Sequence, residues 1–395
     1  MKEHEKGFST RCVHSGSHTD AATGAVVTPI YQSSTFAFRT TQEIVDVASG
    51  RQKGYVYTRH GNPTVRAVEE KISALEEAED SLAFSSGMAA ISTTLLALVS
   101  SGEHLVSMNA IYGGTYELFR DLFPRLGIGV TFVDGTDVSS IDRAFRPETR
   151  LLYVESPANP TMRVVDLRKL CALASEKGVR TVVDNTFATP LNQRPLGLGA
   201  HMVVHSGTKY LAGHSDVVSG SVSGGAEAIG VVRALRKVLG GVMDPHAAWL
   251  LLRGLKTLGV RVERQNKSAA ELARFLQGNA RVSRVFYPGL EDHPDHAIAK
   301  AQMSGFGGML SFELKSGLEG ASRFVESLRI ARLAPSLGGV ETLVTQPATT
   351  SHFWLSPEER ATAGVSDALI RVSVGLEESS DLMADFATAL ATALP

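Results

Sequence analysis

The sequence has few cysteines, no long apolar run and almost no net charge, and each absence excludes a class of protein. Cys12 and Cys171 are the only two cysteines in 395 residues. They are too few for a disulfide framework or a cysteine-ligated zinc site, and they favour a reducing compartment, so we expect a cytoplasmic protein. No uninterrupted apolar stretch approaches the roughly 20 residues that span a bilayer. Residues 1–6 are polar, so we expect neither a signal peptide nor a membrane partner.

The charge balance argues against a polyanionic partner. Lysine and arginine total 39 and aspartate and glutamate total 41, a net charge of −2, so no global basic field indicates nucleic acid. Hydrophobic content of 43% and charged content of 20% are typical of a globular protein with a sizeable core. The length allows one large domain or two of ordinary size. We find no metal-binding motif and expect no metal.

A lysine follows a buried-type strand. The apolar run at 202–204 ends at Ser206 and Thr208, and Lys209 comes directly after them. Desolvation at such a strand end disfavours the charged amine and leaves a nucleophilic lone pair. A solvated loop lysine is the alternative for any lysine considered alone.

A carboxylate lies at the end of an earlier strand. Residues 180–184 are largely apolar and end at Asp184. A carboxylate and a lysine at neighbouring strand ends suit pyridoxal 5′-phosphate (PLP), because the carboxylate keeps the ring nitrogen protonated and the lysine binds the aldehyde as a Schiff base. Taken alone, Asp184 could equally be a helix N-cap. Together with Lys209 it favours PLP as the cofactor.

Strand-like and helix-like segments alternate through residues 55–245, which predicts a mainly parallel sheet in a large domain. Helices are expected from Thr64 to about 75 and over 89–99, and a strand over 81–84. Further alternating segments follow at 103–108, 116–122, 129–133, 140–145 and 150–154. In such sheets ligands bind beyond the carboxyl ends of the strands.

Several loops at these strand ends carry candidate ligand-binding groups. Gly87 and Met88 open a predicted helix, whose N-terminus is either an anion site or a plain tight turn. Tyr57 and Arg59 suit a phosphate clamp or generic surface packing. Tyr112 could lie flat on a cofactor ring or act as a hydrophobic plug.

The two ends of the chain differ from the middle. Residues 1–54 resemble an arm that lies on another surface, such as a sister subunit, because they contain too few apolar residues for a core. Residues 246–395 predict a smaller α+β domain, with a long helical region at 246–277, strands at 308–314 and 369–374, and helices at 321–328 and 382–394. Arg371 lies mid-strand among apolar neighbours, where it either awaits a substrate carboxylate or forms an internal salt bridge.

A family resemblance runs through nearly the whole chain. The motifs that carry it are Tyr57-Thr58-Arg59, Ser85-Ser86-Gly87-Met88, Tyr112-Gly113-Gly114-Thr115, Glu155-Ser156-Pro157-Ala158-Asn159-Pro160, Val183-Asp184-Asn185-Thr186, Ser206-Gly207-Thr208-Lys209-Tyr210 and Arg371-Val372-Ser373-Val374-Gly375. They resemble the Cys/Met-metabolism PLP enzymes, which include cystathionine γ-synthase, cystathionine γ-lyase, methionine γ-lyase and the homoserine sulfhydrylases. The resemblance implies the PLP-dependent transferase fold of type I and a homotetramer built as a dimer of dimers.

The resemblance also implies a role for each candidate residue. Lys209 would bind the cofactor aldehyde and then move protons, and Tyr112 would stack on the ring and serve as general acid. Asp184 would pair with the ring nitrogen and Asn159 with the ring hydroxyl. Gly87, Met88, Ser206 and Thr208 would bind the phosphate, joined by Tyr57 and Arg59 from a neighbouring subunit. Arg371, Ser336 and Tyr57 would bind the substrate, with Arg371 and the Ser336 backbone holding its carboxylate.

The implied activity is transsulfuration chemistry in methionine and cysteine metabolism. The substrate would be a γ-substituted L-amino acid, cystathionine or an acylated homoserine, which undergoes γ-elimination or γ-replacement through a vinylglycine-type intermediate. Methionine γ-lyases usually carry cysteine where Gly114 stands, and cystathionine γ-lyases and many γ-synthases carry glutamate where Pro335 stands. We favour the cystathionine γ-lyase or γ-synthase type; the alternatives are a methionine γ-lyase or homoserine sulfhydrylase, a PLP aminotransferase or decarboxylase, and a scaffold protein without activity.

Overall fold

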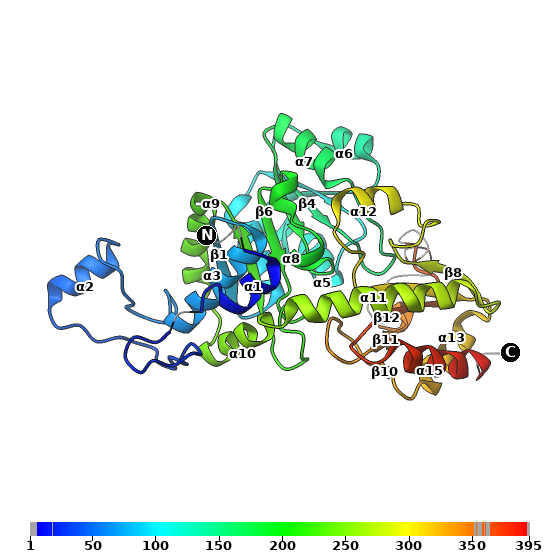
Figure 1. The fold of residues 1–395 in the computed structure, drawn as a ribbon. Coiled ribbons are helices and arrows are strands. Elements are labelled where there is room, and N and C mark those ends of the chain that lie inside the picture. Colours follow the sequence, from blue (N-terminus) through cyan, green and yellow to red (C-terminus); the bar gives the residue numbers. More distant parts are fainter. Residues whose placement is uncertain are drawn as a thin grey trace.

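The computed structural model describes residues 6–17, 19–350, 353, 358, 360 and 364–392. Within these residues the chain forms an N-terminal arm, a seven-stranded sheet covered by helices, and a five-stranded sheet (Figure 1). The described residues thus contain the alternating region and the α+β region that the sequence predicts.

The large sheet is mainly parallel, as predicted. Its strands are β1 (Asp80–Phe84), β2 (His104–Met108), β3 (Gly129–Val133), β4 (Thr149–Glu155), β5 (Arg180–Asp184), β6 (Met202–His205) and β7 (Gly220–Gly224), in the order β1-β7-β6-β5-β4-β2-β3. Only β7 runs against its neighbours. The sequence did not predict β7 because glycine and serine, which dominate it, have low β propensity. The strand is nevertheless buried at every residue, so tertiary packing decides its conformation.

The helices of this region begin where polar residues cap them. They are α3 (Pro63–Glu76), α4 (Gly87–Leu98), α5 (Gly113–Glu117) with the turns η2 (Leu118–Leu122) and η3 (Pro124–Leu126), α6 (Val138–Ala144), α7 (Leu167–Glu176), α8 (Thr189–Asn192), η4 (Pro195–Leu198), α9 (Ala226–Leu239) and α10 (Pro245–Leu255). Asn62 accepts from the Thr64 N–H at the start of α3, and Ser86 accepts from the Ala89 N–H at the start of α4. Such caps satisfy otherwise unpaired amides and fix the first helical residue.

The small sheet is mostly antiparallel. It contains β8 (Val282–Phe286), β9 (Met309–Leu314), β10 (Arg332–Leu333), β11 (Leu343–Thr345) and β12 (Leu369–Ser373), in the order β10-β11-β12-β9-β8. The other elements are α11 (Leu258–Gln277), α12 (His296–Gln302), α13 (Gly317–Ser327), η5 (Pro347–Thr349) and α15 (Ser379–Thr392). The predicted strands correspond to β9 and β12, whereas β8, β10 and β11 were not predicted. The predicted last helix extends to residue 394, which lies outside the described residues.

Helix α11 contributes to two hydrophobic cores and runs lengthwise in Figure 1, with β4 and β6 above it and β10, β11 and β12 below it. Its first part buries Leu258 and Val262 with residues of α3 and α10. Its later part buries Leu272 and Leu276 in the core of the small sheet. Because α10 packs with α3, the change from one core to the other falls within α11. The predicted boundary near residue 245 stays a prediction.

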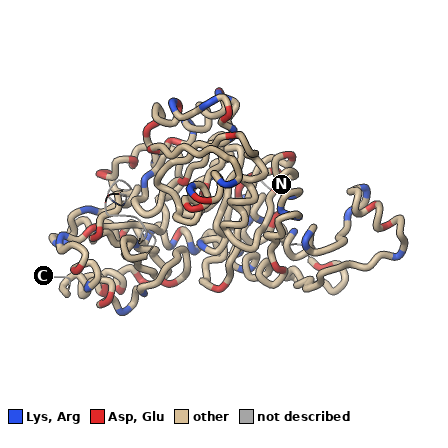
Figure 2. Tube along the Cα trace, turned by 180° about the vertical axis from the view of Figure 1, so that it is seen from behind, with Lys and Arg blue, Asp and Glu red and all other residues tan. Residues whose placement is uncertain are grey.

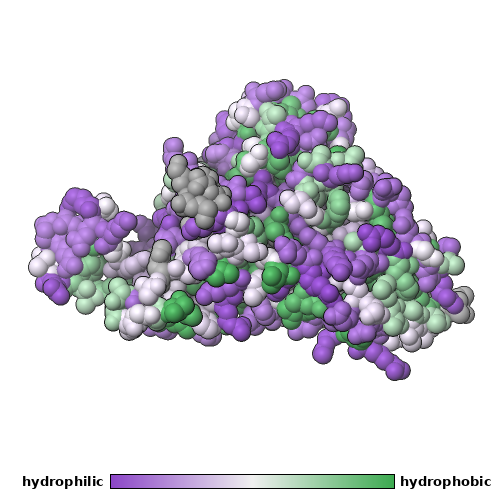
Figure 3. All heavy atoms as spheres, viewed as in Figure 1, coloured by the Kyte–Doolittle hydropathy of each residue, from purple (hydrophilic) through white to green (hydrophobic). Residues whose placement is uncertain are grey.

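The arm is anchored at its start and exposed beyond it. Helix α1 (Phe8–His14) packs on its own chain, because Cys12 is buried and Arg11 donates to the Ala74 carbonyl and pairs with Glu77. None of the described residues from 16 to 61 is buried, and α2 (Thr41–Ala48) lies at the far end of the arm (Figure 1). Hydrophobic residues are visible at the base of the arm (Figure 3). The expectation that residues 1–54 lie on another surface is therefore wrong for α1, which packs on its own chain, and stays a prediction for the rest of the arm.

Acidic and basic residues are interspersed along the chain. Figure 2 shows both signs on the arm and on both sheet regions, in keeping with the net charge of −2. Within the described part of the chain, no helix is long and apolar enough to cross a membrane.

Candidate active site

A pocket of about 680 Å³ opens at the carboxyl ends of the parallel strands. The loops after β1, β2, β4, β5 and β6 line it on one side, and the segment before β11 together with β12 lines it on the other. The lining contains ten of the predicted site residues: Gly87, Met88, Tyr112, Asn159, Asp184, Ser206, Thr208, Lys209, Ser336 and Arg371. The carboxyl ends of the parallel strands meet at one edge of the sheet, and this brings together groups that are far apart in the sequence.

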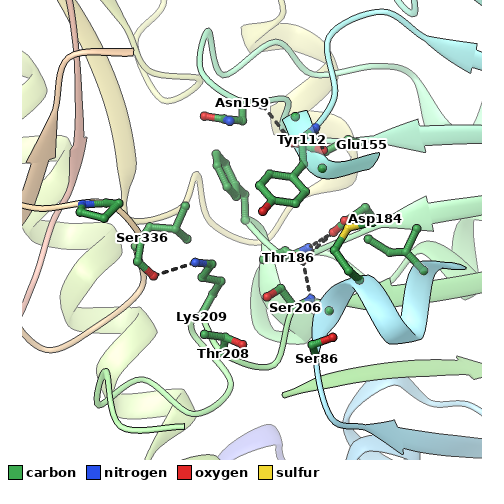
Figure 4. Close-up of a pocket in the computed structure, with 18 of the residues that line it drawn as sticks. Ser86, Tyr112, Glu155, Asn159, Asp184, Thr186, Ser206, Thr208, Lys209 and Ser336 are labelled. Carbon is green, nitrogen blue, oxygen red and sulfur yellow. Dashed lines mark hydrogen bonds between the residues drawn. The ribbon is translucent and has the colours of Figure 1, made fainter. Parts of the chain in front are cut away.

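Lys209 points into the pocket from the turn after β6 (Figure 4). Its Nζ donates to the Ser336 hydroxyl at 2.6 Å. Burial, and then the positive charge of Arg371, lower the pKa of Lys209 to about 8. This half-buried, oriented amine is not the solvated loop lysine that the sequence left open.

Asp184 ends β5 and accepts hydrogen bonds from neutral donors. One oxygen accepts from the Thr186 N–H and hydroxyl at 3.0 and 2.5 Å, and the other from the Tyr153 hydroxyl at 3.2 Å. Burial raises the pKa of Asp184, so a cationic partner would stabilise its charge. The alternative of a helix N-cap is wrong, because α8 begins at Thr189 with Ala188 at its N-cap.

Thr186 is a site residue to which the sequence reasoning gave no role. Its hydroxyl donates to Asp184 and accepts from the Ser206 backbone N–H at 2.9 Å. It therefore ties the end of β5 to the end of β6 (Figure 4). A hydroxyl two residues after an acidic strand end was the signal that could have identified it.

The start of α4 and the loop after β6 form a cradle of the kind that binds phosphate. The first amides of α4 lie beside Ser206, and a Cβ at Gly87 would lie 2.9 Å from the Ser206 side chain. At Gly220 a Cβ would lie 2.2 Å from the Ser86 carbonyl oxygen. The hydroxyl of Thr208 donates to the Ser219 carbonyl and lines the same pocket. Free amides at a helix N-terminus together with hydroxyls are suited to an anion.

Tyr112 faces the open side of the pocket. Its side chain is 48% exposed, and its ring lies between Asn159 and the hydroxyls of Ser206 and Thr208 (Figure 4). A hydrophobic plug would be buried, so that alternative is wrong. The position leaves the ring face available to a flat ligand.

Glu155, which the sequence motifs include but to which we assigned no role, ends β4 next to Asp184. One carboxylate oxygen accepts from the Tyr112 backbone N–H at 2.8 Å and the other from the Asn159 backbone N–H at 3.1 Å. Burial and the negative charge of Asp184 raise the pKa of Glu155 to about 8.

Arg371 reaches the pocket from β12 and is 6% exposed. Its two terminal nitrogens donate to the Asn159 side-chain oxygen at 2.9 Å and to the Ser336 carbonyl at 3.1 Å. No carboxylate of the described residues forms an ion pair with it, so the alternative of an internal salt bridge is wrong. Burial lowers the pKa of Arg371 to about 10, and a bound carboxylate would restore its charge balance.

Tyr57 and Arg59 are not brought into this pocket by their own chain. Both are exposed, and Arg59 donates to the Lys237 carbonyl at 3.0 Å on α9. Its guanidinium lies over the Tyr57 ring at 5.7 Å. The predicted contribution of both residues to a neighbouring subunit's pocket stays a prediction. Among the residues that the structure describes, no cluster of three His, Cys, Asp or Glu side chains could hold a metal ion.

Comparison with known proteins assigns the chain to a family. The model of the family described as "Cys/Met metabolism PLP-dependent enzyme" matches residues 9–391. The chain belongs to this family.

Relatives of this family match over nearly their whole length or over their larger part. The chain is 44% identical to the L-methionine gamma-lyase of Fusobacterium nucleatum subsp. polymorphum, over 98% of each chain. It is 44% identical to cystathionine beta-lyase MetC of Bacillus subtilis (strain 168), over 100% of this chain and 99% of that one. Cystathionine gamma-synthase 1, chloroplastic, of Nicotiana tabacum is 44% identical over 93% of this chain and 68% of its own.

A solved structure shows the same fold. The cystathionine gamma-lyase of Lactobacillus plantarum, complexed with L-serine, superimposes with a TM-score of 0.93 and 40% identity, covering 98% of this chain and 99% of that chain. The chain thus has the PLP-dependent transferase fold of type I that the sequence implied.

The family membership identifies the protein as a PLP-dependent enzyme of the carbon–sulfur lyase and γ-synthase type, which performs elimination or replacement in cysteine and methionine metabolism. The pocket fits this cofactor. Asp184 is a buried carboxylate without a cationic partner among its hydrogen-bond donors, as a protonated ring nitrogen requires. Lys209 is an amine of lowered pKa, as binding of the cofactor aldehyde requires. Gly87 has no side chain, so the space between the start of α4 and Ser206 stays free for the cofactor phosphate.

Proposed function

We propose that the protein acts on a γ-substituted L-amino acid, cystathionine or an acylated homoserine, by γ-elimination or γ-replacement. One observation carries the proposal. Ser336 accepts from Lys209 through its hydroxyl and from Arg371 through its carbonyl. A substrate carboxylate bound at Arg371 would therefore bring Cα next to the Lys209 amine.

Each group of the chain has a distinct part in this chemistry. PLP, when bound, supplies an electron sink that stabilises negative charge at Cα. Arg371 binds and orients the substrate carboxylate. The Lys209 amine, with a pKa of about 8, takes the proton from Cα, gives that proton up again within the site and, neutral once more, takes a proton from Cβ. Removal of the Cβ proton is required for γ-chemistry and is not required for transamination. The Tyr112 phenol, on the open side, is placed to donate a proton to the leaving group.

The two positions that separate relatives by substrate both line the pocket. Gly114 has no side chain and lies against Tyr112, where a Cβ would come within 2.7 Å of the ring. Pro335 lines the pocket and offers no charge at the position where the resemblance implies glutamate in cystathionine γ-lyases. We infer that the γ-substituent is selected by shape at these positions. Gly114 in place of cysteine argues against a methionine γ-lyase, and Pro335 in place of glutamate argues against the usual cystathionine γ-lyase. We therefore keep the cystathionine γ-lyase or γ-synthase type as the leading proposal, with a non-standard γ-substituted amino acid as the substrate.

The test is a substrate panel with purified protein. Cystathionine, methionine, homocysteine, O-acetylhomoserine and O-succinylhomoserine are each incubated with and without a thiol, and the oxo acid and any thioether are identified. We expect 2-oxobutanoate or a thioether, and no product from Lys209→Ala. Pyruvate from cystathionine would mean β-cleavage, the reaction in the name of one relative, and would overturn the proposal. Absence of deuterium exchange at Cβ in D₂O would instead indicate an aminotransferase.

We also propose a homotetramer, built as a dimer of dimers, in the cytoplasm. The exposed arm over residues 16–61, with Tyr57 and Arg59 outside their own pocket, supports a contact with a neighbouring subunit. The buried free thiols of Cys12 and Cys171 are consistent with a reducing compartment. Sedimentation at several concentrations tests the assembly, and a monomer would contradict it.

A further inference from the structure

A chain of hydrogen bonds runs around the pocket and includes one carboxylate whose role the proposed reaction leaves open. Arg371 donates to the Asn159 side chain, and the Asn159 backbone N–H donates to Glu155. The Tyr112 backbone N–H donates to the other oxygen of the same carboxylate. Glu155 thus joins the loop that carries Tyr112 to the loop that carries Asn159 (Figure 4).

The two backbone amides that bind Glu155 belong to Tyr112 and Asn159. Tyr112 is the N-cap residue of α5, and its side chain provides no cap hydrogen bond. Asn159 lies in an irregular loop in which it is 4% exposed. Neither Tyr112 nor Asn159 belongs to a strand, so no sheet ladder fixes their backbones. The Glu155 carboxylate accepts a hydrogen bond from the backbone N–H of each. Its oxygens, separated by a fixed covalent geometry, set the spacing between the two segments.

We propose that Glu155 is a positioning residue for the reaction, because its carboxylate fixes the Tyr112 and Asn159 backbones so that phenol and amide face one another across the cofactor site. The inference rests on the proposed role of Tyr112 as proton donor. Glu155 lies at the end of β4, whose residues from Leu151 on are buried, so its own backbone is rigid. A rigid strand end is the right support for a group that must be held to within a fraction of an ångström.

Glu155→Gln tests this with little change of shape. The amide keeps one acceptor and presents an NH₂ group to the second backbone N–H, so one of the two loops is released. Above pH 8, where the Glu155 carboxyl of the wild type is ionised, we expect kcat to fall roughly ten- to hundredfold, the effect of losing a hydrogen bond to a charged group. We expect KM for the amino acid to change less than threefold, because Arg371 is retained. In cofactor-stripped protein, titration with PLP followed by absorbance should show weaker binding, through the displaced Asn159.

A double-mutant cycle with Tyr112→Phe separates positioning from general damage. If Glu155 acts through the phenol, Glu155→Gln should lower kcat by less than twofold in the Tyr112→Phe background. The matched control is Glu76→Gln, a fully buried carboxylate that binds His205 at 2.5 Å and lies outside the pocket lining. Any effect of this control on kcat should be multiplicative with that of Tyr112→Phe.

The outcomes distinguish the two proposals. Multiplicative effects of Glu155→Gln and Tyr112→Phe, or an unchanged kcat in Glu155→Gln, would overturn the positioning role while leaving the proposed reaction intact. A wild-type protein that turns over none of the panel would overturn the proposed reaction, whereas the PLP titration would still report on Glu155. If Glu155→Gln does not fold, Glu155→Asp replaces it, since the shortened carboxylate reaches only one of the two amides and the same loss of kcat is expected.

Discussion

Replacing Ser336 separates two properties of one residue. Its hydroxyl accepts from Lys209 at 2.6 Å, and its backbone has φ = 86°, which side chains other than glycine rarely adopt. In Ser336→Ala the strained backbone is kept and the hydrogen bond is lost. In Ser336→Gly the hydrogen bond is lost and the strain is relieved. The two variants together therefore measure each contribution.

The magnitudes follow from the geometry. A hydrogen bond from a charged donor contributes about 1.5–3 kcal/mol, so both variants should lose roughly ten- to hundredfold in kcat as the amine loses its orientation. A non-glycine residue at positive φ carries strain of about 1–3 kcal/mol, so Ser336→Gly should unfold at a higher temperature than Ser336→Ala.

The assay is kcat on the best substrate of the panel, with thermal unfolding followed by circular dichroism. Two results would refute the reasoning. If Ser336→Ala keeps kcat within twofold of wild type, the hydroxyl does not orient Lys209. If the glycine and alanine variants unfold at the same temperature, the positive φ stores no strain.

Four further predictions concern the same pocket. The pKa of Lys209 is lowered to about 8, and only the neutral amine attacks an aldehyde; PLP incorporation into stripped protein should therefore speed up with rising pH until about 8 and then level off, whereas a rate that still rises above pH 9 would contradict the burial argument. Arg371→Lys keeps the charge but loses the two-pronged contact, so KM should rise roughly tenfold or more at nearly constant kcat, and an unchanged KM would place the substrate carboxylate elsewhere. Gly114→Ala introduces a Cβ 2.7 Å from the Tyr112 ring and 3.2 Å from the Met88 sulfur, so the ring must shift and kcat should drop by up to about a hundredfold; full activity would show that the ring position is not critical. If the arm completes a neighbouring pocket, mixing denatured Lys209→Ala and Arg59→Ala proteins and refolding them should give hybrid oligomers more active than either parent, and no gain would contradict the exchange of residues.

The sequence predicted the site best where the chemistry sits at the end of an apolar run. Lys209 and Asp184 each follow a short stretch of β-branched residues, and a parallel sheet gathers such ends at one edge. The roles of Glu155 and Thr186 depend on backbone amides that approach from other segments, up to 43 residues away in the chain for Tyr112. Periodicity and composition carry no information about these distances.

The same limit explains the missed elements. Strand β7 consists mostly of glycine and serine, whose local preference for a strand is weak, and its antiparallel pairing with β1 on one side and β6 on the other holds it in place. The two-residue strand β10 is shorter than any pattern that alternation can reveal. Tyr57 and Arg59 lie outside the pocket lining of their own chain, and their predicted place at a neighbouring subunit's phosphate site stays a prediction.

Helix α11 has a mechanical consequence for how the enzyme accommodates its substrates. Its 20 residues extend about 30 Å, and its two halves are embedded in different cores. Helix α11 therefore links the two cores rigidly. A rotation of one sheet relative to the other would have to bend the helix or expose the residues that it buries in one of the cores. We therefore expect substrates of different length to be accommodated by movement of the loops that line the pocket, and not by rotation of the two sheets toward each other.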